Sequence, residues 1–219
     1  MKELLISAHD VSHPYLHDTS GEDGHHCSFI VISGDKGLCG AHNHNVLELA
    51  YDSIVQFQRH SIITIGNTAE DFFRKKAMTP DIALLGIAQD PALSKARVLV
   101  REVMELFDSE HTDEVRIVYT SFYGKTKNTP VVRRLLPILL DDYSDISNVE
   151  LLETMTYHPS PQEVFDLLVP QYILGILFGV MVQAYASEHF ARMNAMHSAT
   201  TNAQDMLKSL RVRYNMARQ

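Results

Sequence analysis

Residues 27–40 read CSFIVISGDKGLCG, and this stretch decides the fold class of the 219-residue chain. Its first half is rich in β-branched and aromatic side chains and predicts a buried strand over 27–33. A glycine-rich turn follows, and apolar residues then recur at helical spacing. This pattern predicts a helix that runs to about Arg59 and has Asn43 or Asn45 as its N-cap.

The alternation of strand and helix continues after this first unit. We expect strands at 61–65, 82–87 and 115–122, and helices at 68–77 and 91–107, the last with Pro91 in its first turn. Parallel strands need crossover helices, so the alternation predicts an α/β fold with a mostly parallel sheet covered on both faces. Segments 131–139 and 149–157 are expected to be extended near an edge, where Pro130 and Pro137 are tolerated.

A long helix is predicted for the C-terminal stretch 160–219. Ser160 and Glu163 form a capping box, with proline at the first helical position. Pro170 is expected to kink the helix, but no convincing stop signal follows. Residues 171–219 as one helix would be about 73 Å long, whereas a compact globule of this chain length is about 44 Å across. The helix must therefore project from the body or pack along another helix that projects.

One stripe of this helix carries small residues at spacings of three and four, which is typical of close helix–helix packing. The stripe consists of Ala184, Ser187, Ala191, Ala195, Ser198 and Asn202, and Met206 and Leu210 continue it. It predicts a coiled coil, and the alternative is packing on the chain's own sheet. The visible intramolecular partner is a short amphipathic helix expected over 2–11 and ended by His13 and Pro14.

Composition and charge exclude several classes of protein. The net charge of −8 argues against a general nucleic-acid binder. From Met181 onward five basic residues stand against two acidic ones, so this end carries +3 and the first 180 residues carry −11. A basic end indicates an acidic partner surface or a solvated helix face. Two cysteines exclude a disulfide scaffold. We expect no secretory signal in 1–16, and the longest apolar run, 172–182, is shorter than the roughly 20 residues that span a bilayer.

The glycine turn lies where nucleotide-binding folds hold phosphate, between a strand and a helix. Its glycines are Gly34, Gly37 and Gly40, which is not the G-x-G-x-x-G spacing. Lys36 precedes a glycine, so the turn is not a P-loop either. We therefore interpret the stretch as a tight turn that needs positive φ, in preference to a nucleotide site.

Histidine and cysteine supply the remaining candidates for chemistry. The histidines near the N-terminus are His9, His13 and His17, the pair His25 and His26 beside Cys27, and His42 and His44. They would suit Zn²⁺, but Pro14 breaks the helix that would align the first three, and solvated loop histidines are the favoured alternative. Cys39 near His42 and His44 suggests a thiol nucleophile, but no carboxylate is placed to orient either base, so packing is favoured. We expect no catalytic residue, metal or cofactor.

Two stretches resemble the gamma subunit of F-type ATP synthases. The turn SGDKGLCG at 33–40, continued by Asn43 and Asn45, is similar to that family's Ser-x-Asp-Arg/Lys-Gly-Leu-Cys-Gly turn. The stretch ASEHFARMNAM at 186–196, with matches that continue to Gln219, resembles the family's C-terminal helix.

The resemblance implies a Rossmann-like globular domain at 27–158, inserted between two antiparallel coiled-coil helices. The C-terminal helix would cover 160–219. The N-terminal helix would be truncated to its end, 1–17, and the family's C-terminal tip would be absent after Gln219.

The function that the resemblance implies is mechanical and not catalytic. The gamma subunit is the rotor of the central stalk, which couples ion translocation through the membrane ring to ATP synthesis or hydrolysis on the alpha and beta subunits. Implied partners are the alpha, beta and epsilon subunits and the membrane ring, but no nucleic acid. For a prokaryotic source the location would be the cytoplasmic face of the membrane. The alternatives are a shortened gamma-like assembly module and an enzyme that reuses the Rossmann-like domain.

The resemblance also implies which residues contact other subunits. Arg218 and Gln219 match an Arg-Gln pair that contacts a loop of the beta subunit, and the glycine turn matches the one that faces the lower rim of the ring. The expected interface residues are Lys36, Leu38, Cys39, Arg192, Met193, Tyr214, Arg218 and Gln219.

Overall fold

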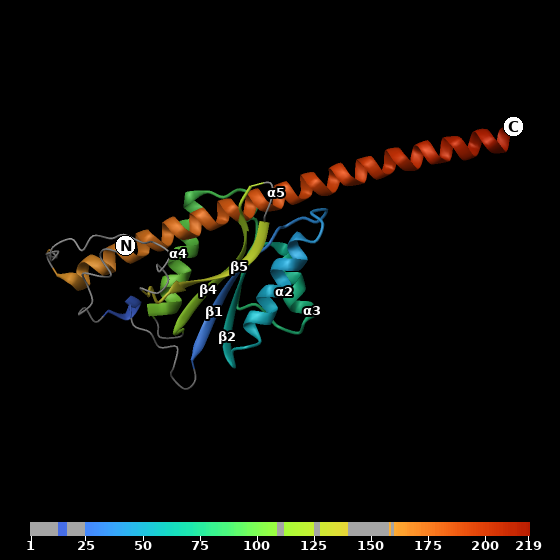
Figure 1. Ribbon diagram of the computed structural model, residues 1–219. Coiled ribbons are helices and arrows are strands. Elements are labelled where there is room, and N and C mark those ends of the chain that lie inside the picture. Colours follow the sequence, from blue (N-terminus) through green and yellow to red (C-terminus); the bar gives the residue numbers. More distant parts are fainter. Residues whose placement is uncertain (1–12, 17–24, 109–111, 125–127, 140–157, 159) are drawn as a thin grey trace.

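The computed structural model describes residues 13–16, 25–108, 112–124, 128–139, 158 and 160–219. Strands and helices alternate along most of it (Figure 1). In chain order the elements are η1 (Pro14–Leu16), β1 (His26–Ile32), α2 (His42–Ile54), β2 (Arg59–Ile65), α3 (Asn67–Lys75), β3 (Ile82–Leu84), α4 (Leu93–Asp108), β4 (Glu114–Phe122), β5 (Asn128–Leu136) and α5 (Pro161–Arg218).

The sheet has the strand order β3-β2-β1-β4-β5. The first four strands are parallel, and β5 runs antiparallel to β4. In the centre, Ile30 of β1 lies between Ile63 of β2 and Ile117 of β4. Pro130 lies in β5, at an end of the strand order, as its missing N–H requires. The expected α/β fold with a mostly parallel sheet is confirmed.

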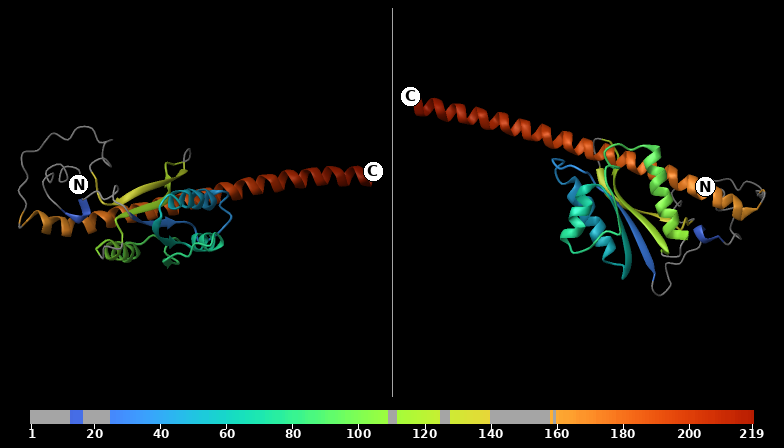
Figure 2. Two further views of the ribbon diagram at one scale, coloured as in Figure 1. Left: turned by 90° about the horizontal axis from the view of Figure 1, so that it is seen from below. Right: turned by 180° about the vertical axis from the view of Figure 1, so that it is seen from behind.

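Both faces of the sheet are buried, because side chains alternate along each strand. In β1, Phe29 and Val31 join an apolar cluster with α2 and α3. Ile30 and Ile32 point the other way, into a larger cluster with α4 and α5. Two helices therefore cover each face (Figures 1 and 2).

The first half of α5 is a core helix. The N-cap of the predicted capping box is confirmed, because Ser160 Oγ accepts a hydrogen bond from the Glu163 N–H at 3.3 Å. The helix continues through Pro170, where we expected a kink, as one element of 58 residues. An 18-residue window reaches a mean hydropathy of 1.9, so by length and composition alone α5 could span a membrane. Its apolar face lies instead against β4 and α4, and Ile173 and Leu177 are completely buried there.

The second half of α5 projects from the body as a single rod (Figures 1 and 2). Every residue from 196 to 219 is exposed, over a length of about 36 Å. The first two positions of the small-residue stripe, Ala184 and Ser187, are buried against the chain's own body, where Ser187 Oγ donates to the Thr120 carbonyl of β4 at 3.3 Å. Beyond them, Ala191 and Ala195 are half-buried, and the stripe is exposed from Ser198 onward. Its expected partner, 2–11, lies outside the described residues.

Several predicted boundaries were wrong for tertiary reasons. The helix α2 ends at Ile54, because Arg59 is already paired with His26 as the first residue of β2. Strand β3 ends at Leu84, since Gly86 turns the chain with φ +72°. The helix α4 begins at Leu93, so Pro91 precedes it. The predicted segment 149–157 lies outside the described residues, and the domain boundaries stay a prediction.

Candidate functional site

The glycine turn leaves the C-terminal end of β1 and runs to the start of α2. Positive φ occurs at Gly40, as expected, and also at Leu38, with φ +64°. Leu38 is 74% exposed, whereas the neighbouring Cys39 is buried. The turn thus exposes the apolar side chain of Leu38 and buries the thiol of Cys39.

The side chain of Asn43 holds the turn closed. We expected Asn43 or Asn45 to cap α2, but the helix begins at His42, and its N-cap, Ala41, makes no side-chain bond. Asn43 Oδ1 accepts from the Gly34 N–H at 3.1 Å, and its Nδ2 donates to the Lys36 carbonyl at 3.3 Å. The amide bridges two points of the turn, so this residue matters for the turn and not for the helix end.

The start of α3 anchors the other side of the turn. Thr68 Oγ1 donates to the Gly34 carbonyl, and its N–H donates to the same oxygen at 3.3 Å. The Ser33 hydroxyl lies 2.8 Å from Thr68 Oγ1. The Asn67 N–H donates to Asp35 Oδ1 at 2.9 Å.

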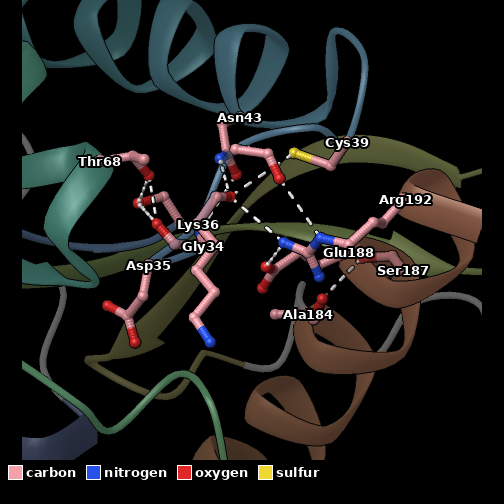
Figure 3. A network of polar contacts seen from close by, with 12 residues as sticks. Gly34, Asp35, Lys36, Cys39, Asn43, Thr68, Ala184, Ser187, Glu188 and Arg192 are labelled. Carbon is pink, nitrogen blue, oxygen red and sulfur yellow. Dashed lines mark hydrogen bonds and ion pairs between the residues drawn. The ribbon is translucent and has the colours of Figure 1, made fainter. Parts of the chain in front are cut away.

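The helix α5 crosses the turn and contacts it through Arg192, which also forms an ion pair with Glu188 of the same helix (Figure 3). Arg192 donates from Nη2 to the Glu188 carboxylate and to the Lys36 carbonyl at 3.2 Å. Its Nε donates to the Gly37 carbonyl at 3.3 Å. The Glu188 carboxylate packs on Gly34, where a Cβ would come within 2.7 Å of it. The missing side chain of Gly34 thus leaves room for this carboxylate, and no positive φ is involved.

A carboxylate of the chain itself lies where a nucleotide fold places phosphate. The pocket at this edge is lined by residues that include Ser33, Gly34, His42 and Glu188, and it has a volume of about 10 Å³. That volume is room for roughly one water molecule. The Glu188 carboxylate occupies the space at Gly34 and disfavours a phosphate there. A second hollow beside the turn, of about 360 Å³, is lined by residues that include Lys36, Glu188 and Arg192.

The electrostatic setting of the turn keeps one histidine neutral. Burial lowers the pKa of His42 below its ordinary value of 6.5. The Glu188 carboxylate opposes this shift, and the Arg192 guanidinium adds to it. His42 is therefore an uncharged group packed at the start of α2.

The cysteines do not form a nucleophilic site in the described residues. The Cys39 thiol points to the Lys36 carbonyl, with Sγ 4.0 Å from the oxygen. Burial raises the pKa of the Cys27 thiol, and the nearby Glu114 carboxylate raises it further. A protonated, buried thiol is a poor nucleophile.

Two of the described histidines, His25 and His13, each lie beside one carboxylate rather than in a group of metal ligands. His25 Nε2 lies 3.0 Å from Glu114, and His13 Nε2 lies 3.2 Å from Asp166. Among the described residues no group of three or more His, Cys, Asp or Glu side chains could hold a metal ion. His9 and His17 lie outside the described residues.

The structure places the expected interface residues at two separate positions. Lys36, Leu38 and Cys39 lie beside Arg192, and Met193 follows it as an exposed residue. The remaining three are exposed at the far end of α5, about 40 Å along the helix: Tyr214, Arg218 and Gln219. The first group lies on the body and the second lies at the tip of the rod.

The chain is similar to known proteins over its whole length. The whole chain, residues 1–219, matches the family described as ATP synthase. It is 34% identical over 230 residues to the ATP synthase gamma chain of Caldanaerobacter subterraneus subsp. tengcongensis, covering 100% of this chain and 77% of that relative. The chain belongs to the ATP synthase gamma chain family. Another gamma chain, from Alkaliphilus metalliredigens, is 39% identical over 88% of this chain and 67% of that relative.

Solved ATP synthase structures share the fold of this gamma chain family member. The central stalk and c-ring structure of Tetrahymena thermophila mitochondrial ATP synthase contains a chain with a TM-score of 0.68 at 17% identity, which covers 91% of this chain and 85% of that one. The rotor of Euglena gracilis mitochondrial ATP synthase gives 0.65 at 17% identity, over 99% and 86%. Over these shares of the chain, both likenesses show that this fold occurs in solved ATP synthase structures.

Glu188 and Thr68 are among the residues of the site that were absent from the expected set. Glu188 had a detectable signal, because it precedes Arg192 by one helical turn on a helix expected to pass the body. Thr68 had no such signal. Only the pairing of β2 with β1 brings the start of α3 against the turn.

Proposed function

We propose that this chain is the rotor shaft of an ATP synthase. The distal part of α5 turns inside the ring of alpha and beta subunits, and the body binds the epsilon subunit and the membrane ring. Ion flow through the membrane ring turns the shaft, and the shaft drives ATP synthesis. In the opposite direction, ATP hydrolysis turns the shaft and pumps ions. The catalytic sites lie on the beta subunits. For a bacterial source, as in the relatives, the body lies at the cytoplasmic face of the membrane.

The observation that carries this proposal is the exposure of apolar side chains along a rigid rod. Met206, Leu210 and Tyr214 are between 51% and 68% exposed. Exposed apolar side chains in a row indicate a surface for a partner. Four basic residues against one acidic residue over 196–219 give the same rod a charge of +3, which suits an acidic lining.

The two groups of interface residues then have separate roles. Leu38 and Lys36 on the turn face the lower rim of the ring of alpha and beta subunits, whereas the buried Cys39 packs inside the turn with its thiol toward the Lys36 carbonyl. Arg218 and Gln219 at the far end of α5 contact a loop of the beta subunit.

A rotation assay tests the proposal. The chain is assembled with the alpha and beta subunits from the same genome, and the ring of alpha and beta subunits is fixed to glass. A bead is attached to the body through a cysteine that replaces Asp52, which is exposed on α2. We expect unidirectional rotation that requires ATP. Failure of the chain to copurify with alpha and beta, or a bead that never turns while ATP is hydrolysed, contradicts the rotor function.

A further inference from the structure

The helix α5 changes its surroundings abruptly at Arg192. Before it, Ser187 and Glu188 are buried against the body. After it, nearly every side chain is exposed, and within the described residues no later polar contact of α5 reaches the body. Arg192 is therefore the point at which the rod leaves the domain.

The guanidinium of Arg192 is suited to hold that point. Its planar group offers several N–H donors in a fixed geometry. Here they reach the two successive carbonyls of Lys36 and Gly37 as well as the Glu188 carboxylate. One side chain thus joins α5 to a turn 156 positions earlier in the sequence.

The turn that Arg192 holds is itself tied to two further helices. Asn43 connects it to α2, and Thr68 connects it to α3. On the other side of the pair, the Glu188 carboxylate fills the space left by the missing side chain of Gly34. The contacts form one continuous network from both faces of the sheet to the base of the rod (Figure 3).

We propose that Glu188 and Arg192 form a clamp that limits the angular play of the distal half of α5 at the point where it leaves the body. The rod beyond Arg192 is about 40 Å long, so an angular play of about 10° there moves the tip by about 7 Å. The clamp keeps that play small. Its consequence for torque rests on the proposed rotor function, whereas its effect on the rod's angular play does not.

The angular play of the rod is measured with two spin labels in the full chain. Cysteines replace the exposed residues Asp52 on α2 and Asn202 on the rod, and both native thiols are buried. We expect Arg192→Gln to widen the distance distribution about twofold. Arg192→Lys gives an intermediate width, because one ammonium group cannot satisfy two carbonyls and a carboxylate in the same geometry.

Two further variants complete this test. Gly34→Ala pushes the Glu188 carboxylate away from Arg192 and widens the distribution without changing either residue of the pair. Arg97→Gln, at an exposed position on α4, leaves the width unchanged. An unchanged width in Arg192→Gln overturns the clamp. If Arg192→Gln loses its melting transition, the widths of the distance distributions in Arg192→Lys and Gly34→Ala are used instead. Unchanged widths in both of these variants overturn the clamp.

The torque part is tested in vesicles that hold the assembled ATP synthase. We expect Arg192→Gln to keep ATP hydrolysis while the ions pumped per ATP fall about twofold, and Arg97→Gln to keep both. A widened distance distribution with unchanged pumping overturns the torque role. Absence of pumping by the unmodified chain refutes the rotor function instead, and the spin-label result still decides the clamp.

Discussion

At the scale of single residues, the glycines at and near the turn have different environments. Gly34 leaves space for the Glu188 carboxylate, a long-range requirement. Gly66 precedes α3 with φ +102°, and a Cβ there would clash with the Ser33 carbonyl. Gly37 has open space around it and no positive φ. These environments make separate predictions for each glycine.

Gly66→Ala is expected to lower the free energy of unfolding by about 2–3 kcal/mol, because the new side chain meets backbone in a strained conformation. Gly37→Ala is the control and should change it by less than about 0.5 kcal/mol. Urea denaturation of both variants measures the difference. Equal effects would show that the φ at Gly66 is not the determining factor.

His42 makes stability depend on pH. Its pKa is lower in the folded chain than the ordinary 6.5, so its contribution to stability is complete above pH 6.5 and is lost as the pH falls through the folded value. The unmodified chain should therefore lose more unfolding free energy between about pH 7.5 and about pH 5.5 than His42→Gln does. His44→Gln, exposed on the same helix, should keep the full pH dependence. Identical slopes in all three proteins would rule out this role.

At the scale of elements, α5 serves two environments with one continuous helix. Its first half supplies a face of the core through side chains such as Phe165, Val169 and Ile173, all completely buried. Its second half is exposed. The change of environment coincides with the clamp and not with a helix break.

The core face of α5 can be tested with a matched pair of truncations. Phe165→Ala is expected to cost about 3–5 kcal/mol of unfolding free energy, because it opens a cavity among packed side chains. Leu167, two residues later, is 74% exposed, and Leu167→Ala should cost less than about 0.5 kcal/mol. Similar losses in the two variants would place the wrong face of α5 on the body.

At the scale of the whole molecule, a globular body and an exposed rod are joined at one place. The body has a buried core on both faces of its sheet. The rod beyond position 196 adds nothing to that core among the described residues. Stability and assembly should therefore depend on different parts of the chain.

A chain that ends at Met196 tests this separation. We expect its melting temperature to stay within about 3 °C of the full chain, because every removed residue is exposed. Copurification with the alpha and beta subunits should be lost. A truncated chain that unfolds, or one that still assembles with the alpha and beta subunits, would contradict the separation of stability in the body from assembly through the rod.

The fold was accessible from sequence because its signals are local. The β-branched run 27–33, the glycine turn and the alternation that follows predicted a parallel sheet with helices on both faces. Helix and strand ends were less accessible, because pairing decides them: Arg59 belongs to β2 only through its partner His26. In the same way, Asn43 has the chemistry of an N-cap but bonds to the turn instead.

The sequence by itself determined the α/β class, the long C-terminal helix and the membership that the turn and helix motifs indicated, since each depends on neighbouring residues or on periodicity. Only the tertiary structure decided that Glu188 and Arg192 meet the turn. That contact depends on where α5 crosses the sheet, and the packing of Ile173 and Leu177 on the body sets this crossing. Contacts between distant segments follow from the summed packing of the core, which no local pattern contains.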